Sequence, residues 1–270
     1  MKLGKNYLLP AVLLLGMFSL GIPLAFAASF TTFDVPGFEG RTTPLGINAR
    51  GQIVGMVGSH GFLLDHGIFT LIDVPGASET QARGINDRSQ IVGLYFDGQS
   101  GGPGRHGFLL DHGTFTTIDM PGSTTGLFDG INDKGQIVGS FSRGIFLLDH
   151  GRFTNVPTLI DAFAINARGE IVGDAVEGGS GVLDNGAFTI IDVPGSLANT
   201  TRALRINNRG QIVGFYFSDT HHGFLFDQGR FTTIDAPGAV ATELTGINDA
   251  GHIVGIVDDA RGQHGFIVIP

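Results

Sequence analysis

Short apolar runs recur along almost the whole chain, and polar, glycine-rich breaks separate them. The runs are rich in Ile, Val, Phe and Thr, which favour β-strands. Most of the runs are apolar throughout and do not alternate strictly, which is typical of strands that are covered on both faces. The pattern therefore predicts many short strands in sheets that pack against one another.

Three phrases repeat in a fixed order. The first is Ile-Asn-x-x-x-x-Ile-Val-Gly, the second is His-Gly-Phe-Leu-Leu-Asp-His-Gly at 60–67, and the third is Phe-Thr-Leu-Ile-Asp-Val-Pro-Gly at 69–76. The first phrase occurs six times, with its Asn at Asn48, Asn86, Asn132, Asn166, Asn207 and Asn248. Each repeat holds four strand-like runs in about 40 residues, which is the repeat pattern of a β-propeller.

The breaks between the runs have the chemistry of tight turns. In Asn-Asp-Lys-Gly at 132–135, Asn stands first and Gly fourth, which suits a type I turn with Gly at positive φ. Asp-His-Gly at 65–67 suits a second tight hairpin. Val-Pro-Gly suits a turn with Pro second and Gly third. Since this turn chemistry explains the Asn-Asp-x-Gly residues, we do not interpret them as a calcium loop.

The two ends of the chain complement each other. The sixth repeat stops at Ile269 without its third phrase, whereas residues 30–37 supply that phrase before the first repeat. An N-terminal strand that pairs with three C-terminal strands closes a ring, and it removes the open edges that the alternative, a solenoid, must cap. We therefore predict an all-β, six-bladed β-propeller with four-stranded blades in residues 28–270, its last blade completed by the N-terminal strand.

This closure places the Phe-Thr strand outermost in each blade and the Gly-Ile-Asn strand innermost. The turns between first and second strands and between third and fourth strands then share one face, and their lengths barely vary. The other connections differ in length and share the opposite face, which we call the variable-loop face. Binding residues usually lie on such loops. We therefore place any site on residues 97–105, 174–180, 218–222 and 258–264.

Charge and composition narrow the range of functions. With 16 Lys+Arg against 25 Asp+Glu, the net charge is −9, so we expect no nucleic-acid partner. The chain has no Cys, which excludes disulfides, thiolate metal sites and a cysteine nucleophile. It contains no phosphate-loop or His-Glu-x-x-His motif.

The first 27 residues have the pattern of a secretory signal peptide. Lys2 and Lys5 precede an apolar run at 7–24, and Ala25-Phe26-Ala27 fits a cleavage site after Ala27. The alternative is an uncleaved membrane anchor, for which the run is marginally short. We expect an extracellular or periplasmic protein, monomeric and with no transmembrane segment in the mature chain.

Histidines and aspartates gather at the predicted variable-loop face. Four third strands open with histidine, at His60, His106, His222 and His264. Aspartates precede three of them, at Asp97, Asp219, Asp258 and Asp259. These groups could bind a divalent cation such as Ca²⁺ or act as an acid–base pair. We favour the simpler interpretation that each His fixes a turn in its own blade, and we predict neither a metal nor another cofactor.

Repeats two and five share Val-Gly-x-Tyr-Phe, which places Tyr95 and Tyr216 on opposite blades. Each Tyr either stacks on a ligand or packs in the core with its hydroxyl at the blade edge. The residues we single out for binding on the variable-loop face are Tyr95, Asp97, His106, Tyr216, Asp219, His222, Asp258 and His264.

The phrase Gly-Ile-Asn-Asp-x-Gly-Gln-Ile-Val-Gly followed by His-Gly-Phe-Leu resembles the bacterial extracellular HAF repeat. In that repeat the second phrase is His-Ala-Phe-Leu followed by Trp. Here Gly replaces the Ala, at Gly61, Gly107, Gly223 and Gly265, and Leu or Phe replaces the Trp. The resemblance covers essentially all of residues 28–270. It implies export and a repeated β fold, and it brings no established reaction or catalytic residues.

These observations predict a non-enzymatic scaffold that binds an extracellular ligand, protein or glycan through the variable-loop face. The alternative is an exported hydrolase or lyase that uses His and Asp on the same face, with or without a metal ion. A third possibility is a passive component of the envelope or matrix.

Overall fold

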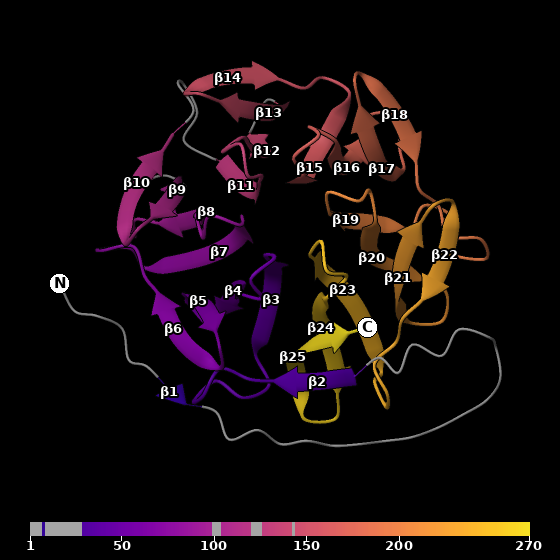
Figure 1. Cartoon of the computed structure of the whole chain (residues 1–270), viewed down its shortest axis with the longest axis horizontal. Helices are drawn as coiled ribbons and strands as arrows, with labels where there is room; N and C mark the ends of the chain where they lie inside the picture. Colours follow the sequence, from indigo (N-terminus) through magenta and orange to yellow (C-terminus); the bar gives the residue numbers. More distant parts are fainter. Residues whose placement is uncertain (1–6, 9–28, 99–103, 120–125, 142–143) are drawn as a thin grey trace.

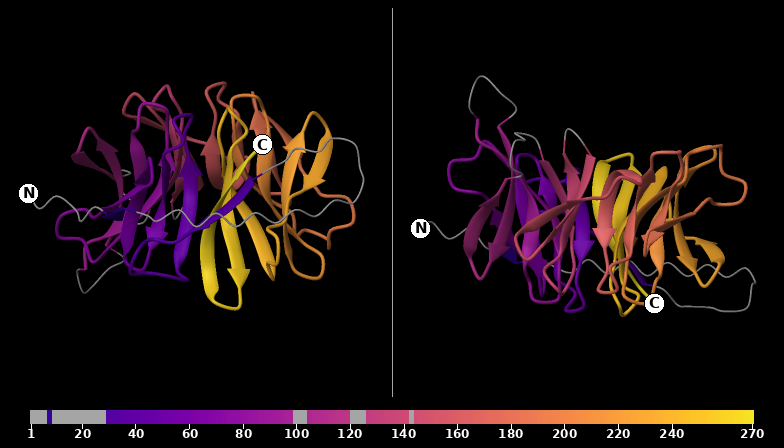
Figure 2. Two further views of the ribbon diagram at one scale, coloured as in Figure 1. Left: turned by 60° about the horizontal axis from the view of Figure 1, so that its bottom comes forward. Right: turned by 90° about the horizontal axis from the view of Figure 1, so that it is seen from above.

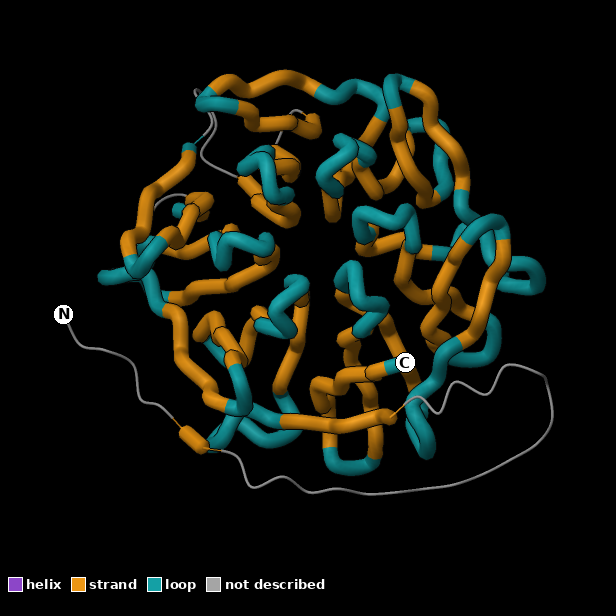
Figure 3. The backbone as a smooth tube through the Cα atoms, in the orientation of Figure 1, coloured by secondary structure: helices purple, strands orange, loops and turns teal. Residues whose placement is uncertain are grey.

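The computed structural model describes residues 7–8, 29–98, 104–119, 126–141 and 144–270. Within these ranges the chain forms six antiparallel sheets, arranged as blades around one axis (Figures 1 and 3). The predicted cleavage site at Ala27 and residues 99–103 of the longest variable connection lie outside the described residues. Signal cleavage therefore stays a prediction.

Each blade has the same strand order from the axis outward, as the repeats predict. The inner strands are β3 (Thr42–Ile47), β7 (Glu79–Ile85), β11 (Gly126–Ile131), β15 (Leu159–Ile165), β19 (Arg202–Ile206) and β23 (Ala241–Ile247). The second strands are β4 (Ile53–Val57), β8 (Ile91–Phe96), β12 (Ile137–Phe141), β16 (Ile171–Ala175), β20 (Ile212–Phe217) and β24 (Ile253–Asp259). Blades 1 to 6 are numbered in the order of these inner strands.

The two outer layers complete each blade. The third strands are β5 (His60–Asp65), β9 (Arg105–Asp111), β13 (Gly144–Asp149), β17 (Ser180–Asp184), β21 (His221–Asp227) and β25 (Gly262–Ile269). The outermost strands are β6 (Ile68–Ile72), β10 (Thr114–Ile118), β14 (Arg152–Asn155), β18 (Ala187–Ile190), β22 (Arg230–Thr233) and β2 (Ser29–Phe33). A two-residue strand, β1 (Tyr7–Leu8), also pairs with the free edge of β6.

The ring closes through the N-terminal strand, which confirms the predicted closure. β2 pairs antiparallel with β25, with Ser29 opposite Ile269 and Phe33 opposite Gly265. Figure 2 shows β2 lying beside the strands of the last blade. Blade 6 is thus built from both ends of the propeller domain, and it has no unpaired edge where the ring meets.

The predicted turns form as expected. The amide of Gly51 donates to the carbonyl of Asn48 at 3.0 Å, which closes a four-residue turn with Gly51 at φ +77°. In the Asp-His-Gly hairpin, His66 and Gly67 have φ of 48° and 78°. Positive φ at both central residues is the type I′ geometry that matches the twist of a β-hairpin. Both kinds of turn lie on the same face, which we call the hairpin-turn face.

The Gly of Ile-Val-Gly lets the inner strand approach closely. A Cβ at Gly139 would overlap the carbonyl oxygen of Leu127 and would lie 3.0 Å from the ring of Phe146. The inner strand has a register shift beside this contact, between Phe128 and Gly130. Any larger residue at this position would therefore separate the first two strands of the blade.

The core lies between the blades. Each buried cluster joins two neighbouring sheets, such as Val254 of blade 6 with Phe62 and Phe69 of blade 1. The Phe of the His-Gly-Phe phrase is fully buried in the blades that carry it, as in Phe108 and Phe224. Strands covered on both sides explain the continuous apolar runs of the sequence.

One predicted connection is shorter in the structure than expected. The connection expected at residues 258–264 contains only residues 260 and 261, because β24 and β25 extend until Asp259 pairs with Gly262. Asp258 and Asp259 therefore lie in a strand, not in a loop. In the described part of the chain, no helix has the length and apolar character needed to cross a membrane.

Candidate functional site

In blade 2, the structure brings together three of the residues that we singled out for binding. The rings of Tyr95 and His106 are stacked with their centroids 5.1 Å apart. His106 Nε2 lies 3.6 Å from Asp97 Oδ2, and His106 Nδ1 lies 2.9 Å from Asp119 Oδ1. The Tyr95 hydroxyl bonds to Thr117 Oγ1 at 3.0 Å, and its ring packs against the core.

Blade 5 repeats this arrangement. Tyr216 stacks on His222 with a centroid distance of 5.4 Å, and its hydroxyl lies 3.1 Å from Thr233 Oγ1. His222 Nδ1 lies 2.9 Å from Asp235 Oδ2, and His222 Nε2 lies 2.9 Å from Asp219 Oδ1. Both tyrosines thus have their hydroxyls at the blade edge and pack partly against the core, the second of the two arrangements the sequence allowed.

Blade 6 places Asp259, not Asp258, beside the histidine. His264 Nδ1 lies 2.7 Å from Asp34 Oδ2 of the closing strand region, and His264 Nε2 lies 3.3 Å from Asp259 Oδ1. Asp258 is exposed and pairs through its backbone. In blade 1, His60 Nδ1 bonds to Asp73 Oδ1 at 2.8 Å.

Each of the four histidines therefore bonds to an aspartate of the third phrase in its own blade. The clusters of blades 2 and 5 lie on opposite sides of the ring, so they do not form one site (Figure 1). Among the residues that the structure describes, no three His, Asp or Glu side chains lie where they could hold a metal ion. The arrangement supports the interpretation that these histidines fix their blades.

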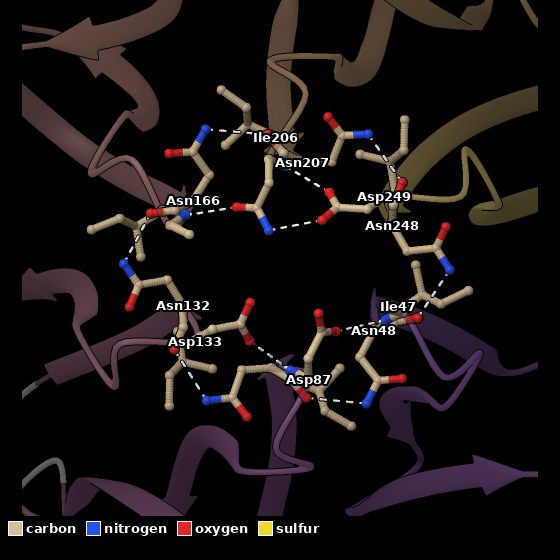
Figure 4. A pocket seen from close by; sticks show the side chains of 18 residues that line it. Ile47, Asn48, Asp87, Asn132, Asp133, Asn166, Ile206, Asn207, Asn248 and Asp249 are labelled. Carbon is tan, nitrogen blue, oxygen red and sulfur yellow. Dashed lines mark hydrogen bonds between the residues drawn. The ribbon is translucent and has the colours of Figure 1, made fainter.

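A second constellation lies on the axis, at the hairpin-turn face. The amide Nδ2 of each repeated Asn donates to the backbone carbonyl of the Asn in the next blade, and Asn248 donates to Asn48 at 2.9 Å (Figure 4). The other five bonds of this cycle are 2.9–3.1 Å long. The Oδ1 of each Asn accepts amides of its own turn, as from Arg50 and Gln52 to Asn48. Six buried side chains thus form a closed hydrogen-bonded ring, which we call the Asn ring.

A shallow cavity of about 80 Å³ opens at the Asn ring, with room for several waters. The residue after each Asn lines its mouth, and three of these residues are acidic: Asp87, Asp133 and Asp249. Asp87 Oδ1 accepts the amide of Ala49 at 2.7 Å, and Asp133 Oδ1 accepts the amide of Asp87 at 2.8 Å. Burial, and then the charges of Asp133 and Asp249, raise the pKa of Asp87.

Below the mouth, one arginine crosses the axis. Arg205 of β19 donates to the carbonyls of Leu45 in blade 1 at 3.0 Å, Arg83 in blade 2 at 3.2 Å and Phe163 in blade 4 at 3.1 Å. Burial lowers the pKa of Arg205 to about 10. At this position the other inner strands carry small residues: Gly46, Gly84, Gly130, Ala164 and Gly246. The small residues leave space on the axis for the guanidinium.

Arg83 and Asp129 form a second group of charged side chains near the axis. Arg83 bonds to Asp129 Oδ1, and Asp129 is 1% exposed with its Oδ2 buried and without a partner in the described residues. Burial, and then the charge of Asp129, raise the pKa of Asp161. Asp129 and Arg205 line a chamber of about 70 Å³, so water-sized molecules are what this space can hold.

The axial residues were not predicted from the sequence. The turn alone explains the repeated Asn, whereas in the structure its side chain also bonds to the next blade. A signal was present, because Arg205 interrupts a series of Gly or Ala before Ile-Asn. On the ring model, such residues must meet at the axis.

No protein-family model and no curated protein matches this chain. Solved structures are similar in fold. A streptogramin B lyase has a TM-score of 0.56 at 11% identity, over 89% of this chain and 97% of that one. A gluconolactonase from Xanthomonas campestris has a TM-score of 0.56 at 11% identity, over 86% and 87%.

The propeller domain of the trilobed protease from Pyrococcus furiosus has a TM-score of 0.52 at 14% identity, over 84% of this chain and 81% of that one. That domain is described as having an open velcro topology, whereas β2 closes the ring here. At these identities the likeness extends to the fold alone. The chain is an all-β, six-bladed propeller.

Proposed function

We propose that this protein is an exported, non-enzymatic scaffold that binds an extracellular ligand or partner through its variable-loop face. One observation carries the proposal. In the described part of the chain, most of the exposed large apolar side chains lie at the variable-loop face: Ile160, Val176, Ile190, Leu197 and Val240, each 51–67% exposed. Exposed apolar residues that gather on one face, above connections of differing length, are typical of interaction surfaces.

Blade 4 carries the densest part of this surface. Ile160 stands near the start of β15, Val176 follows β16, and Ile190 ends β18. The amide of Val176 donates to the carbonyl of Thr158 at 3.2 Å, which holds the β16–β17 turn beside the start of β15. This hydrogen bond fixes part of the backbone under the apolar surface, which lowers the entropy cost of binding a partner there.

The alternative, a hydrolase or lyase, is favoured by the raised pKa of Asp161, since a general acid must stay protonated at higher pH than a surface carboxyl. Asp161 lines neither axial cavity, and the chamber lined by Asp129 holds about 70 Å³, too little for a substrate larger than a few waters. The third-strand histidines, which we call the rim histidines, each bond to an aspartate of their own blade: His60, His106, His222 and His264. The binding proposal is the better supported of the two.

The proposal is tested by replacing the apolar surface of blade 4. We expect the triple variant Ile160→Ser, Val176→Ser, Ile190→Ser to fold normally, because exposed substitutions change stability by about 0.5 kcal/mol or less. Tagged protein would be incubated with the medium and envelope fraction of the producing cells, and retained molecules quantified by mass spectrometry.

The matched control is Ile68→Ser, which removes an apolar side chain that is 38% exposed beside the Asp-His-Gly turn on the hairpin-turn face. Molecules retained by the wild type and by the control should be lost from the triple variant. If the triple variant retains the same molecules in the same amounts, the variable-loop face of blade 4 is not the binding surface.

A further inference from the structure

Three rim histidines have a carboxylate beside each ring nitrogen. The carboxylate beside Nδ1 comes from the segment that follows the outermost strand: Asp119, Asp235 and Asp34. On Nε2 it comes from the second strand or the connection after it: Asp97, Asp219 and Asp259. We call each set of one His and two Asp an imidazole clamp. Each clamp links the outer edge of a blade to the start of a variable connection.

The chemistry of imidazole makes these clamps depend on protonation. An ionised carboxylate only accepts hydrogen bonds, and a neutral imidazole carries one N–H. A neutral His222 can therefore donate to Asp219 or to Asp235, but not to both. The protonated ring has two N–H donors and a positive charge, so it satisfies both carboxylates at once. The geometry of the clamp is complete only with the charged ring.

The clamp of blade 5 shows this most clearly. Two carboxylates face His222, Asp219 from the connection after β20 and Asp235 from the segment after β22, both at 2.9 Å. They raise the pKa of His222, Asp219 first. The hydrogen bond from His222, and then that from Ser218, lower the pKa of Asp219. The neighbouring His221 is bonded separately to Glu243 at 2.6 Å.

These directions set the pH window of the clamp. Because the pKa of His222 is raised by folding, its contribution is complete below the unfolded value of about 6.5 and is lost as pH rises through the folded value. Because the pKa of Asp219 is lowered, its contribution is complete above about 3.9 and is lost only as pH falls through the folded value. His222 can therefore donate to both carboxylates in mildly acidic solution, and to only one of them in alkaline solution.

We propose that the imidazole clamp of blade 5 makes the order of the β20–β21 connection depend on pH, holding it against the blade when His222 is protonated and releasing it when His222 is neutral. The Nε2–carboxylate distance is 2.9 Å at His222, but it is longer in the other two clamps, 3.3 Å at His264 and 3.6 Å at His106. His60 contacts a single carboxylate in the described residues, so blade 1 has no such clamp. This regulation rests on the proposed binding role of the variable-loop face, but its test needs no ligand.

The test is amide hydrogen exchange at pH 5.5 and pH 8.5, corrected for the intrinsic exchange rate. The amide of Ser218 donates to the carbonyl of Thr220 at 3.2 Å and reports the β20–β21 connection directly. In the wild type we expect its protection to fall by about twofold or more at the higher pH, as for loss of an exposed ion pair. In Asp219→Asn the protection should be low at both pH values.

A control variant and an NMR titration show whether the change in exchange comes from the clamp. Glu177→Gln is the matched control, because Glu177 is an exposed carboxylate in the β16–β17 turn of the same face, outside the clamps. It should leave the exchange of Ser218 unchanged. By NMR, the midpoint of the His222 titration should be lower in Asp219→Asn than in the wild type, whereas the melting temperature should be nearly the same.

The clamp model fails if Ser218 is equally protected at both pH values in the wild type, or if Asp219→Asn leaves both its exchange and the His222 titration unchanged. Neither result would bear on whether the face binds a partner. Conversely, failure of the blade 4 triple variant to lose binding would leave the clamp model intact.

Discussion

The two faces of the propeller are built on the same strands, yet they use their residues differently. On the hairpin-turn face, near-identical turns carry the Asn ring, in which each blade donates to the next. On the variable-loop face, connections range from residues 58–59 to residues 97–104. The polar contacts there differ from blade to blade, as between His221 and Glu243 or between Thr43 and Gln263, and they form no repeated cycle. The repeated residues therefore hold the ring closed, whereas the proposed recognition depends on residues that vary from blade to blade.

The largest expected effect on stability comes from breaking the Asn ring. Asn207 is 4% exposed, donates to Asn248 at 3.0 Å and to Gln211, and accepts the amides of Arg209 and Gln211. We expect Asn207→Ala to lower the free energy of unfolding by about 2–3 kcal/mol, because it leaves buried polar groups without partners. Chemical denaturation measures this loss.

Glu177→Ala, on the opposite face, serves as the control and should stay within about 0.5 kcal/mol of the wild type. Equal effects of the two substitutions would contradict the idea that the hairpin-turn face holds the ring.

The next effect in size concerns the axis between the faces. Arg205→Gly introduces the residue found in most other blades, yet it should lower the free energy of unfolding by about 2 kcal/mol, because the carbonyls of Leu45, Arg83 and Phe163 lose their donor. The loss is smaller than for the Asn ring, since removing a buried charge also relieves its desolvation.

Arg205→Lys separates charge from shape. It keeps the positive charge but lacks the planar fork that reaches three blades, so denaturation should place it between the wild type and Arg205→Gly. A lysine variant as stable as the wild type would show that the charge alone matters on the axis.

The smallest expected effect is a gain in stability from a substitution at the mouth of the axial cavity. Folding raises the pKa of Asp87 above its ordinary value of 3.8, so stability falls as pH rises through this range and the carboxyl ionises. Asp87→Asn should therefore raise the unfolding free energy at pH 7 by a few tenths of a kcal/mol. An amide fits there, because Asn208 accepts the amide of Ala167 at 2.7 Å just as Asp87 accepts that of Ala49.

The gain from Asp87→Asn should disappear near pH 2.5, well below the ordinary value of 3.8, where the wild-type carboxyl is protonated in both states. Melting curves at pH 2.5 and pH 7 measure the difference. A gain that is independent of pH would show that charge repulsion with Asp133 and Asp249 is not its source.

Much of the fold follows from local sequence patterns. The type I turn at Asn48, the type I′ turn at His66 and the strand order of the blades depend on a few adjacent residues, and their φ values and pairings agree with the prediction. The rim clusters were predicted in part. The sequence brought Tyr95, Asp97 and His106 to one blade edge, but it chose Asp258 where the structure uses Asp259. The reason is that β24 continues through Asp258 and Asp259, which pair with Gln263 and Gly262. The turn residues in the sequence do not show how far this strand extends.

By itself, the sequence determined the number of blades, the turns, the closing strand and the division into two faces, because each depends on local backbone preferences and on the phase of a repeat. Only the tertiary structure decided what meets on the axis. The bond from Asn248 to Asn48 joins residues 200 positions apart, and that from Arg205 to Leu45 joins residues 160 apart. Such contacts exist only once the ring has closed, because no local preference brings residues so far apart in the chain within hydrogen-bonding distance.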